Sequence, residues 1–472
     1  MTSASKPVLF LPHHIVSLRE MLTIARFLEL EHGVEARMLC LREEFSAFLR
    51  EEGFSEKGVI PLYSGTSEKA GKPASLSAKD LLLKAPWLVK ILKAGKALLL
   101  GKRKYRQAAA KSFGFDKTLD RAREILRDEN PLSLAVVSDN WLGQGWNLAF
   151  LRAARDLDIP TAIVPIAYSA NKTSLMEMRR QGAELLAGRH PGLRKRFPGQ
   201  SALDEQTGRE YFFYHPMALA ELDRLGMLPA NPWVPGGGLS GRVLVEGEEA
   251  VERLASQGCA REKIVVTGHP SHDGLYGLLQ DKKGLRRKLD AAYGLDPDKK
   301  LAVASLQQAA EHRVVTWDVH WKNIRALCRA LSRDGINCLV SLHPRMDPAQ
   351  YGFVESEYGL PVARERLADF LPAADVFSAA FSSTIFWAIL CGIPTISYDL
   401  IGQDYDVFDS FPGVVKVRDT EQLGLELDKL ARDPEHYSRL ALAQREQAAP
   451  LAPFDGRSLA RVARALLKPD QM

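Results

Sequence analysis

The chain has 472 residues, more than one hydrophobic core usually serves, and this indicates two large domains. Its hydrophobic fraction of 46%, charged fraction of 26% and net charge of +5 are ordinary for a soluble globular protein. No apolar run approaches the ~20 residues that cross a bilayer, and the first residues lack a signal-peptide pattern, so we expect a cytoplasmic protein. The five cysteines lie far apart, which favours free buried thiols over disulfides or a zinc site.

The first residues alternate between strand and helix patterns. An apolar strand from Val8 to Leu11 ends at His13 and His14, a helix follows over about 17–32, and further strands are predicted at 34–41 and 59–63. Because ligands in open parallel sheets collect at the carboxyl ends of strands, both histidines are candidate site residues. Either one could instead be a surface or capping residue.

The alternation stops between residues 64 and about 115, where many Lys and Arg residues are interspersed with Leu, Ile and Trp. The pattern predicts a basic, amphipathic helical insertion in the N-terminal domain. Such a segment could lie on the inner face of a membrane, where basic residues meet anionic headgroups. It could also be a packed helical pair with a solvated basic face.

Regular alternation resumes with a helix near 117–127 and a strand at 134–138 that ends at Asp139. Asp139 is a candidate general base at the same edge as the histidines, or a cap of the following helix. A helix at 144–157 and strands at 161–165, 211–214, 243–245 and 263–267 follow. The glycine-rich loop at 232–241 precedes a strand, so it is predicted to be a mobile loop and not a nucleotide fingerprint.

A polar stretch at 275–298 indicates a domain boundary, which gives domains of 1–275 and 276–472. His269, His272 and Asp273 precede it and could line a cleft or cap the linker. Beyond it, strands at 301–305, 337–342, 360–363, 376–381 and 395–398 alternate with helices, which predicts a doubly wound α/β domain. Three helices near 421–431, 434–448 and 456–467 end the chain.

Polar and basic residues follow three strands of the second domain. They offer amides, imidazoles, guanidiniums and hydroxyls at a helix start, which together suit a diphosphate or a phosphate diester. Gln403, Asp404 and Asp406, after the strand that ends at Tyr398, could contact a donor sugar or form an ordinary polar loop. The candidate phosphate-binding residues are Gln307, His312, Arg313, His343, Arg345, Ser382, Ser383 and Thr384.

Four phrases, TGHPSHDGL, HPR, SST and GIPTI, together resemble the GT-B superfamily of nucleotide-sugar enzymes. Their HP and SS pair is similar to bacterial polysialyltransferases and capsule Kdo transferases, which use CMP-sugars, and to CDP-glycerol glycerophosphotransferases. The resemblance covers most of the second domain, and the first only in its order of strands and helices. It implies an α/β fold of two doubly wound Rossmann-like domains facing across a cleft, and phosphate contacts from His343, Ser382 and Ser383.

The chain also resembles non-hydrolysing UDP-N-acetylglucosamine 2-epimerases, through TGHPSHD and the loop that contains His312 and Arg313. Two differences from the epimerase motifs make an epimerase the second choice of function. The acidic HVEAG-type motif of the epimerases is replaced by PIAYSANKT, and their SGG with following glutamates is replaced by SSTIFWA. Proton abstraction from the sugar needs those carboxylates.

The expected function is metal-independent glycosyl or phosphoglycosyl transfer in bacterial surface polysaccharide synthesis, such as capsule assembly. The second domain would hold a CMP-, CDP- or UDP-linked donor, and the first an oligosaccharide or lipid-linked acceptor. His343, Arg345 and Arg313 would neutralise the leaving phosphate, so neither a metal nor a cofactor is expected. Asp139, His13 or His14 would be the base, with possible peripheral membrane contact through the insertion. Binding of the nucleotide sugar without chemistry remains an alternative, and nucleic-acid binding is not expected.

Overall fold

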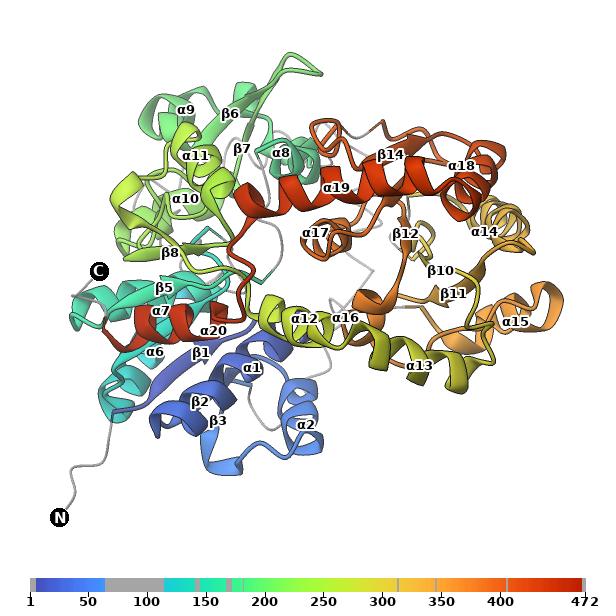
Figure 1. Ribbon diagram of the computed structural model, residues 1–472. Coiled ribbons are helices and arrows are strands. Elements are labelled where there is room, and N and C mark those ends of the chain that lie inside the picture. Colours follow the sequence, from blue (N-terminus) through green and yellow to red (C-terminus); the bar gives the residue numbers. More distant parts are fainter. Residues whose placement is uncertain are drawn as a thin grey trace. The chain divides into compact units, whose positions relative to one another are not determined.

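The computed structural model describes residues 6–63, 114–140, 145–166, 172–180, 182–311, 314–343, 346–404 and 406–468 (Figure 1). It divides into two compact units. Unit 1 comprises Met1–Val245, Ala250–Val265 and Val462–Met472, and unit 2 comprises Glu246–Glu249 and Val266–Arg461. The expected basic insertion at 64–115 lies almost wholly outside the described residues.

Unit 1 is built on a seven-stranded sheet in the order β3-β2-β1-β4-β5-β8-β9. Its central strand β1 is apolar and fully buried, and it pairs in parallel with β2 and β4. Strands buried on both faces are typical of parallel sheets covered by helices. The strands are β1 (Val8–Leu11), β2 (Ala36–Cys40), β3 (Val59–Pro61), β4 (Ser133–Val136), β5 (Thr161–Ile163), β8 (Arg242–Val245) and β9 (Ile264–Val266).

Helices follow most strands of this sheet. They are α1 (Ile15–His32), α2 (Glu43–Glu51), α6 (Phe115–Glu129), α7 (Trp146–Asp156), α8 (Lys172–Arg180), α9 (Pro191–Arg196), α10 (Pro216–Arg224) and α11 (Glu248–Ser256). The strand expected at 211–214 belongs elsewhere: β7 (Arg209–Phe212) pairs antiparallel with β6 (Ser201–Asp204) in a separate hairpin.

The strand order of unit 1 reverses at β1, which is flanked by β2 on one side and β4 on the other. At such a switch point the loops after the two central strands diverge and leave a crevice, where ligands bind in doubly wound folds. The loops concerned carry His13 and His14 after β1, and Asp139 after β4.

Unit 2 repeats the design with the order β11-β10-β12-β13-β14, again with parallel pairs. The strand expected at 360–363 is reduced to one parallel bridge between Val340 and Val362. The switch point lies between β10 and β12, so the loops that begin at Leu306 and Ala380 flank it. The strands are β10 (Leu301–Ser305), β11 (Asn337–Ser341), β12 (Val376–Ala379), β13 (Thr395–Tyr398) and β14 (Val414–Val417).

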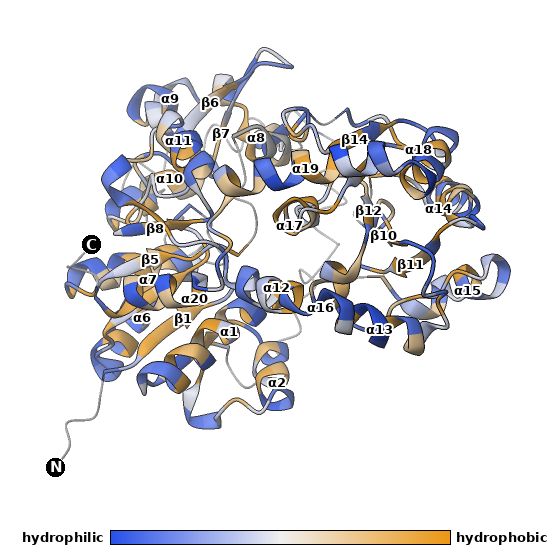
Figure 2. Cartoon of the chain, viewed as in Figure 1, coloured by the Kyte–Doolittle hydropathy of each residue, from blue (hydrophilic) through white to orange (hydrophobic). Residues whose placement is uncertain are grey.

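The helices α14 (Trp317–Leu331), α15 (Phe353–Tyr358), α16 (Leu367–Phe370), α17 (Thr384–Leu390), α18 (Thr420–Arg432) and α19 (Pro434–Leu451) surround this second sheet. Their apolar faces form a core with the strands, in which Leu327, Ile396 and Leu427 are at most 1% exposed. In Figure 2 the strands of both sheets are mostly orange, and blue residues lie on the outer faces of the helices.

The polar stretch at 275–298 is not a linker, which corrects the expected boundary. It forms the end of α12 (Pro270–Gln280) and all of α13 (Lys282–Tyr293), both within unit 2. The polar composition is typical of a linker, but it arises here because α13 buries little more than Leu289 and is otherwise polar, as its blue colour in Figure 2 shows. Arg286 bridges Asp290 and Asp375, which ties the helix to the start of β12. The chain passes from unit 1 to unit 2 earlier, at Val265 and Val266.

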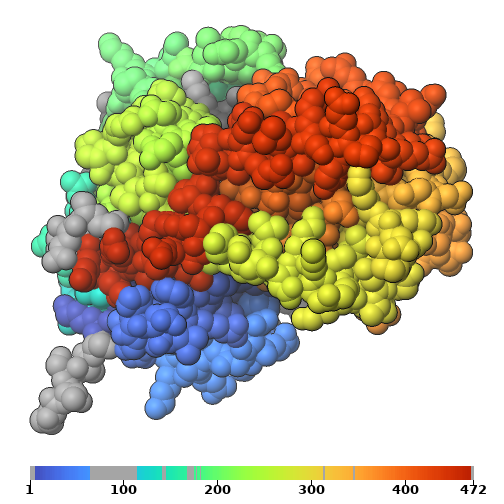
Figure 3. All heavy atoms as spheres, in the orientation of Figure 1, coloured from blue at the N-terminus to red at the C-terminus, as the bar shows by residue number. Residues whose placement is uncertain are grey.

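The last helix, α20 (Ser458–Leu467), also departs from the expected division at residues 1–275 and 276–472. From Val462 onward it belongs to unit 1, where the side chains of Val462 and Leu466 are fully buried. Figure 1 shows this red helix beside blue and teal elements of unit 1, and in Figure 3 red spheres lie against blue ones.

All five cysteines are free, as expected. Four are buried and Cys391 is half-buried; burial raises the pKa of Cys40 to about 11 and that of Cys338 to about 12. Within the described residues, no helix is long and apolar enough to cross a bilayer.

Candidate functional site

The Ser382–Thr384 segment follows β12 and opens α17 at the switch point of unit 2. Ser382 organises the turn: its Oγ lies 2.8 Å from the Thr384 Oγ1 and accepts a bond from the Thr384 N–H at 3.3 Å. Ser383 is exposed, and its side chain makes no capping bond. The two serines therefore differ, because Ser382 holds the helix start while Ser383 presents its hydroxyl to solvent.

Gln307 stands on the other side of this switch point, just after β10. Its side-chain N–H group donates to the Gln403 Oε1 at 3.3 Å, which links the loops after β10 and β13. A cavity of about 20 Å³ lies at this edge, lined in part by Gln307, Phe381, Gln403 and Arg418. Its size admits a single water molecule.

Asp399 shapes the loop that carries Gln403. Partial burial alone would raise its pKa, but backbone N–H groups, first that of Asp404 and then those of Gln403 and Ile401, lower the pKa overall. The Asp404 and Ile401 bonds measure 2.7 and 3.2 Å. Asp404 in turn forms an ion pair with Arg418 at 2.8 Å. Asp404 is thus committed to a structural pair, while Gln403 borders the cavity.

His343 follows β11 and is half-buried. A tight turn holds it: the Met346 N–H donates to the His343 carbonyl at 2.8 Å, and the His343 N–H to the Met346 Sδ at 3.4 Å. Because β11 and β12 flank β10, the strand ends before His343 and Ser382 lie about 10 Å apart on one edge, with Gln307 between them. The three positions can therefore serve one extended ligand.

His312, Arg313 and Arg345 lie outside the described residues. The loop residue just before His312 is anchored, however, because the Tyr351 hydroxyl donates to the Glu311 Oε1 at 2.7 Å. The same hydroxyl lies 2.7 Å from His320 Nε2, which donates to it since the Tyr351 proton is already engaged. Burial lowers the pKa of His320, so the ring is neutral at neutral pH.

In unit 1, His14 is a helix cap. Its Nδ1 accepts the Ser17 N–H of α1 at 3.1 Å, and the Ser17 Oγ accepts the His14 N–H at 3.0 Å. This reciprocal capping box accounts for a histidine and a serine at this spacing. The capping alternative therefore describes His14.

His13 has a different environment. Its Nε2 lies 3.2 Å from the Asn147 Oδ1, and the Asn147 side-chain N–H group donates to the Ser138 carbonyl at 2.5 Å. That bond turns the amide oxygen toward His13, so Nε2 carries the ring proton and Nδ1 carries the lone pair. Burial, and then the neighbouring His14, lower the His13 pKa to about 4, although the Asn147 bond opposes the shift. His13 is therefore neutral at neutral pH, at the unit 1 switch point.

Asp139 is not available as a base, which corrects the expectation for it. Its side chain has no exposed surface, and it accepts bonds from the Gly236 N–H at 2.9 Å, the Gly238 N–H at 2.8 Å and the Ser240 hydroxyl at 2.7 Å. Burial, and then the Asp139 charge, raise the pKa of Tyr214 well above its ordinary value. Asp139 therefore anchors the glycine-rich loop, which is a packed element of unit 1.

The glycines of this loop are needed for that packing. Gly236 has a φ of +86°, which side-chain-bearing residues rarely adopt. A Cβ on Gly238 would lie 2.7 Å from the Asp139 carbonyl oxygen and 2.8 Å from its Oδ2. The glycines are therefore needed because the loop passes close to the Asp139 carboxylate. The sequence alone does not show this reason for them.

The residues of the TGHPSHDGL phrase are caps in unit 2. His269 accepts the Ser271 N–H at 3.1 Å at the start of α12. Asp273 accepts the Ser458 and Leu459 N–H groups at 2.8 and 2.9 Å, so it caps α20. His272 is buried, and burial, with nearby His269 and Arg461, lowers its pKa well below the ordinary value.

Sequence reasoning missed Asn147, Ser17 and Asp399, which position the candidate residues. Asn147 had a signal, since it is the polar residue on the buried face of α7 (WNLAFLRAARD), where it is fully buried. Ser17 lies in the first turn of α1, three residues after His14, and Asp399 directly follows β13, and neither position had a stronger signal. Among the residues that the structure describes, no group of His, Cys, Asp or Glu side chains is arranged to hold a metal ion.

Solved structures resemble the chain over nearly its whole length. UDP-GlcNAc 2-epimerase from Neisseria meningitidis, bound to UDP-GlcNAc, is 11% identical, with 98% of this chain and 99% of that chain covered and a TM-score of 0.53. The spinosyn forosaminyltransferase SpnP is 12% identical, with 98% and 100% covered and a TM-score of 0.52. The wall teichoic acid polymerase TagF, soaked with CDPG, is 11% identical, with 98% and 88% covered and a TM-score of 0.51.

No family model matches the sequence, and no curated protein is significantly similar to it. At these identities the likeness concerns the fold. The expected fold class, α/β with two Rossmann-like domains of the GT-B type, is confirmed by the two parallel sheets and by these neighbours.

Proposed function

We propose that the protein is a metal-independent transferase that moves a glycosyl or phosphoglycosyl group from a nucleotide-linked donor to a hydroxyl acceptor. Unit 2 binds the CMP-, CDP- or UDP-linked donor, and unit 1 binds an oligosaccharide or lipid-linked acceptor. Bacterial surface polysaccharide synthesis is the setting. The observation that carries the proposal is the carboxyl edge of unit 2, where Gln307, His343 and Ser383 follow three adjacent strands.

This edge suits the phosphates of a nucleotide. Gln307 supplies an amide and Ser383 an exposed hydroxyl, and they stand on the two sides of the switch point where doubly wound folds bind ligands. His343 stands one strand further along, within reach of a second phosphate or the leaving oxygen. Donors arranged before the reaction stabilise the charge that develops on a departing nucleotide without the need to reorganise.

The bond from the donor group to the nucleotide phosphate breaks, its electron pair leaves with the nucleotide, and the acceptor oxygen forms the new bond. The acceptor proton goes to the Nδ1 of His13, whose other nitrogen is held protonated by Asn147. A His13 pKa of about 4 keeps this nitrogen unprotonated at neutral pH.

Two observations favour transfer over isomerisation. The epimerase-type acidic motif is replaced in the sequence, and the carboxylate after β4, Asp139, already accepts three hydrogen bonds and has no exposed surface. Removal of a sugar C–H proton needs an available base of suitable strength. Within the described residues of the β1 and β4 loops, His13 is the candidate base. A pKa of about 4 makes His13 too weak to remove a proton from a sugar carbon but able to take a hydroxyl proton as the new bond forms.

The test begins with nucleotides. CMP, CDP and UDP are compared by thermal denaturation, because a ligand that binds only the folded state stabilises it by about 2.7 kcal/mol at about 100 times its Kd. We expect one of the three to raise the melting temperature, and the His343→Ala and Ser383→Ala variants to lose that increase. If none of the three stabilises the protein, the donor site is wrong.

Isomerisation is the second candidate, because UDP-GlcNAc 2-epimerase shares the fold. The purified protein incubated with UDP-N-acetylglucosamine and no acceptor separates the two reactions. Formation of the 2-epimer would replace the transferase proposal. Nucleotide release that requires an acceptor would support it, and binding without turnover under both conditions would leave a nucleotide-sugar-binding protein.

A further inference from the structure

A second polar cavity lies in unit 1. It is at the edge of the sheet opposite to the edge that carries His13. Its volume is about 550 Å³, and it is lined by the first residues of the neighbouring strands: Ser133 begins β4, Thr161 begins β5 and Arg242 begins β8. Ligands of doubly wound folds normally bind at the carboxyl ends. This cavity at the amino ends is therefore separate from the switch point that holds His13.

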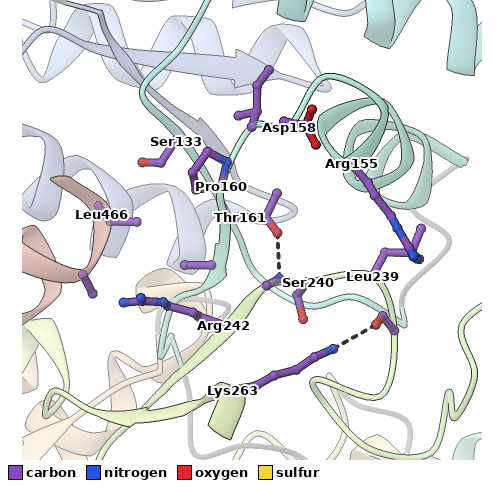
Figure 4. Close-up of a pocket in the computed structure, with 15 residues that line it drawn as sticks. Ser133, Arg155, Asp158, Pro160, Thr161, Leu239, Ser240, Arg242, Lys263 and Leu466 are labelled. Atoms are coloured by element: carbon purple, nitrogen blue, oxygen red, sulfur yellow. Dashed lines mark hydrogen bonds between the residues drawn. The ribbon is translucent and has the colours of Figure 1, made fainter. Parts of the chain in front are cut away.

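Three cationic side chains line the cavity and come from three elements. Arg155 lies at the end of α7, Arg242 at the start of β8 and Lys263 just before β9, as Figure 4 shows. Among the residues that the structure describes, no carboxylate lies within ion-pair distance of Arg155, Arg242 or Lys263. Lys263 instead donates to the Gly236 and Gly238 carbonyls, each at 3.3 Å. Asp158 is the one acidic residue among the described residues of the lining, so these residues give the cavity a surplus of two positive charges.

Two buried polar atoms of the lining lack a hydrogen-bond partner. They are the Ser133 hydroxyl, whose residue is 2% exposed, and the Arg242 Nη1. An unpartnered buried donor costs about 1–3 kcal/mol, so such groups in native proteins usually meet a ligand, an ion or water. Both atoms belong to residues that line the same cavity, so a bound molecule can pair with both once these side chains rotate toward it.

We propose that this cavity binds a small phosphate monoester, in a second ligand site of the protein. A phosphate monoester carries about −1.5 to −2 charges at neutral pH, which matches the surplus of positive charge. Guanidinium groups bind phosphate with two parallel hydrogen bonds, and the Ser133 hydroxyl can supply a third donor. The volume falls within the roughly 300–1,000 Å³ of small-molecule sites and exceeds what a bare phosphate fills, so the ester carries a sugar-sized group.

The site is joined to the glycine-rich loop. Residues Gly238 to Gly241 form part of the lining, and Gly238 and Ser240 also bind Asp139. A bound phosphate ester would add contacts to a loop that already packs on the residue after β4. Binding therefore stabilises unit 1 without the use of any residue of the proposed donor site.

The experiment compares ribose 5-phosphate with ribose and with glucuronate, by calorimetric titration of the full chain at constant ionic strength. The test variant is Arg155→Gln with Arg242→Gln. The control is Arg121→Gln with Arg127→Gln, which removes the same charge from exposed positions on α6. We expect ribose 5-phosphate to bind the wild type and the control equally, and the test variant at least about tenfold more weakly.

Two further variants serve as controls for this titration. Ser133→Ala removes a hydroxyl that has no partner, so we expect no loss of stability in the free protein but weaker binding of the phosphate ester. His343→Ala with Ser383→Ala should leave ribose 5-phosphate binding unchanged, which separates this site from the nucleotide site. Equal affinity in the test and control variants, binding of glucuronate as tight as that of the phosphate, or no binding to the wild type would each overturn the proposal.

Discussion

Adjacent residues of one type perform different tasks in this protein, and the difference is set by tertiary partners. Ser382 is engaged with the Thr384 side chain and backbone, whereas Ser383 is exposed and makes no cap bond. His14 caps α1, whereas His13 is oriented by Asn147, a residue 134 positions away in the sequence. A motif written as SS or HH therefore contains one structural and one candidate functional residue.

The serine pair gives a prediction at this scale. Ser382→Ala removes the hydroxyl that accepts the Thr384 N–H, and we expect a loss of about 0.5–2 kcal/mol of stability, as for other helix-start residues. Ser383→Ala should leave stability unchanged and weaken nucleotide binding. Chemical denaturation and nucleotide titration of both variants measure the two effects. A Ser383→Ala protein with wild-type nucleotide affinity would remove this residue from the site.

The His13 imidazole gives a pH prediction. Its pKa is lowered from 6.5 to about 4, so between these pH values the unfolded chain binds a proton that the folded chain does not. Stability contributed by this residue is therefore present above pH 6.5 and is lost as the pH falls toward 4. His13→Gln should reduce this acid-side decline in denaturation midpoints, and an unchanged pH profile would contradict the environment described for His13.

The same residue can be tested by turnover. A general base contributes about 10²–10⁴-fold, so His13→Gln should lower kcat by that factor once the substrates are identified. The matched control is His14→Asn, which keeps a side chain able to cap α1 and should retain activity. Similar activities for the two variants would show that another group takes the acceptor proton.

At the scale of elements, the glycine-rich loop and the residue after β4 form one unit. Asp139 accepts two backbone bonds and one hydroxyl bond, and an asparagine in its place would present an N–H group to at least one of these donors. We expect Asp139→Asn to lose about 3 kcal/mol of stability, measured by chemical denaturation, and Ser240→Ala to lose about 1 kcal/mol. A stable but inactive Asp139→Asn protein would return Asp139 to the list of candidate bases.

At the scale of the whole molecule, the last helix belongs with the first sheet. Leu466 in α20 and Leu427 in α18 are both fully buried, the first in unit 1 and the second in unit 2. Truncation of a buried leucine to alanine costs about 2–5 kcal/mol. We expect hydrogen exchange to accelerate in β1 and β4 for Leu466→Ala, and in β10 and β12 for Leu427→Ala. The reverse pattern would contradict the division into units.

Much of this architecture was predictable, because its strands are short apolar runs between turn signals, such as VLFL at β1 and LAVAS at β10. The elements that escaped are those whose local pattern is weak or polar. The strand β14 (VVKV) contains a lysine and is only partly buried, whereas β1 is buried throughout. The helix α13 has the polar composition of a linker because its buried surface is small. The role of Asp139 escaped for a different reason: its partners lie about a hundred positions away, and no local pattern records them.

The placement of α20 has a consequence for how the protein is made. Synthesis proceeds from the N-terminus, and domains usually fold in that order as they emerge from the ribosome. Here the sheet that is translated first lacks one of its covering helices until Ser458–Leu467 has been translated. The N-terminal unit is therefore begun first but finished last, and its folding waits for the intervening unit to be synthesised.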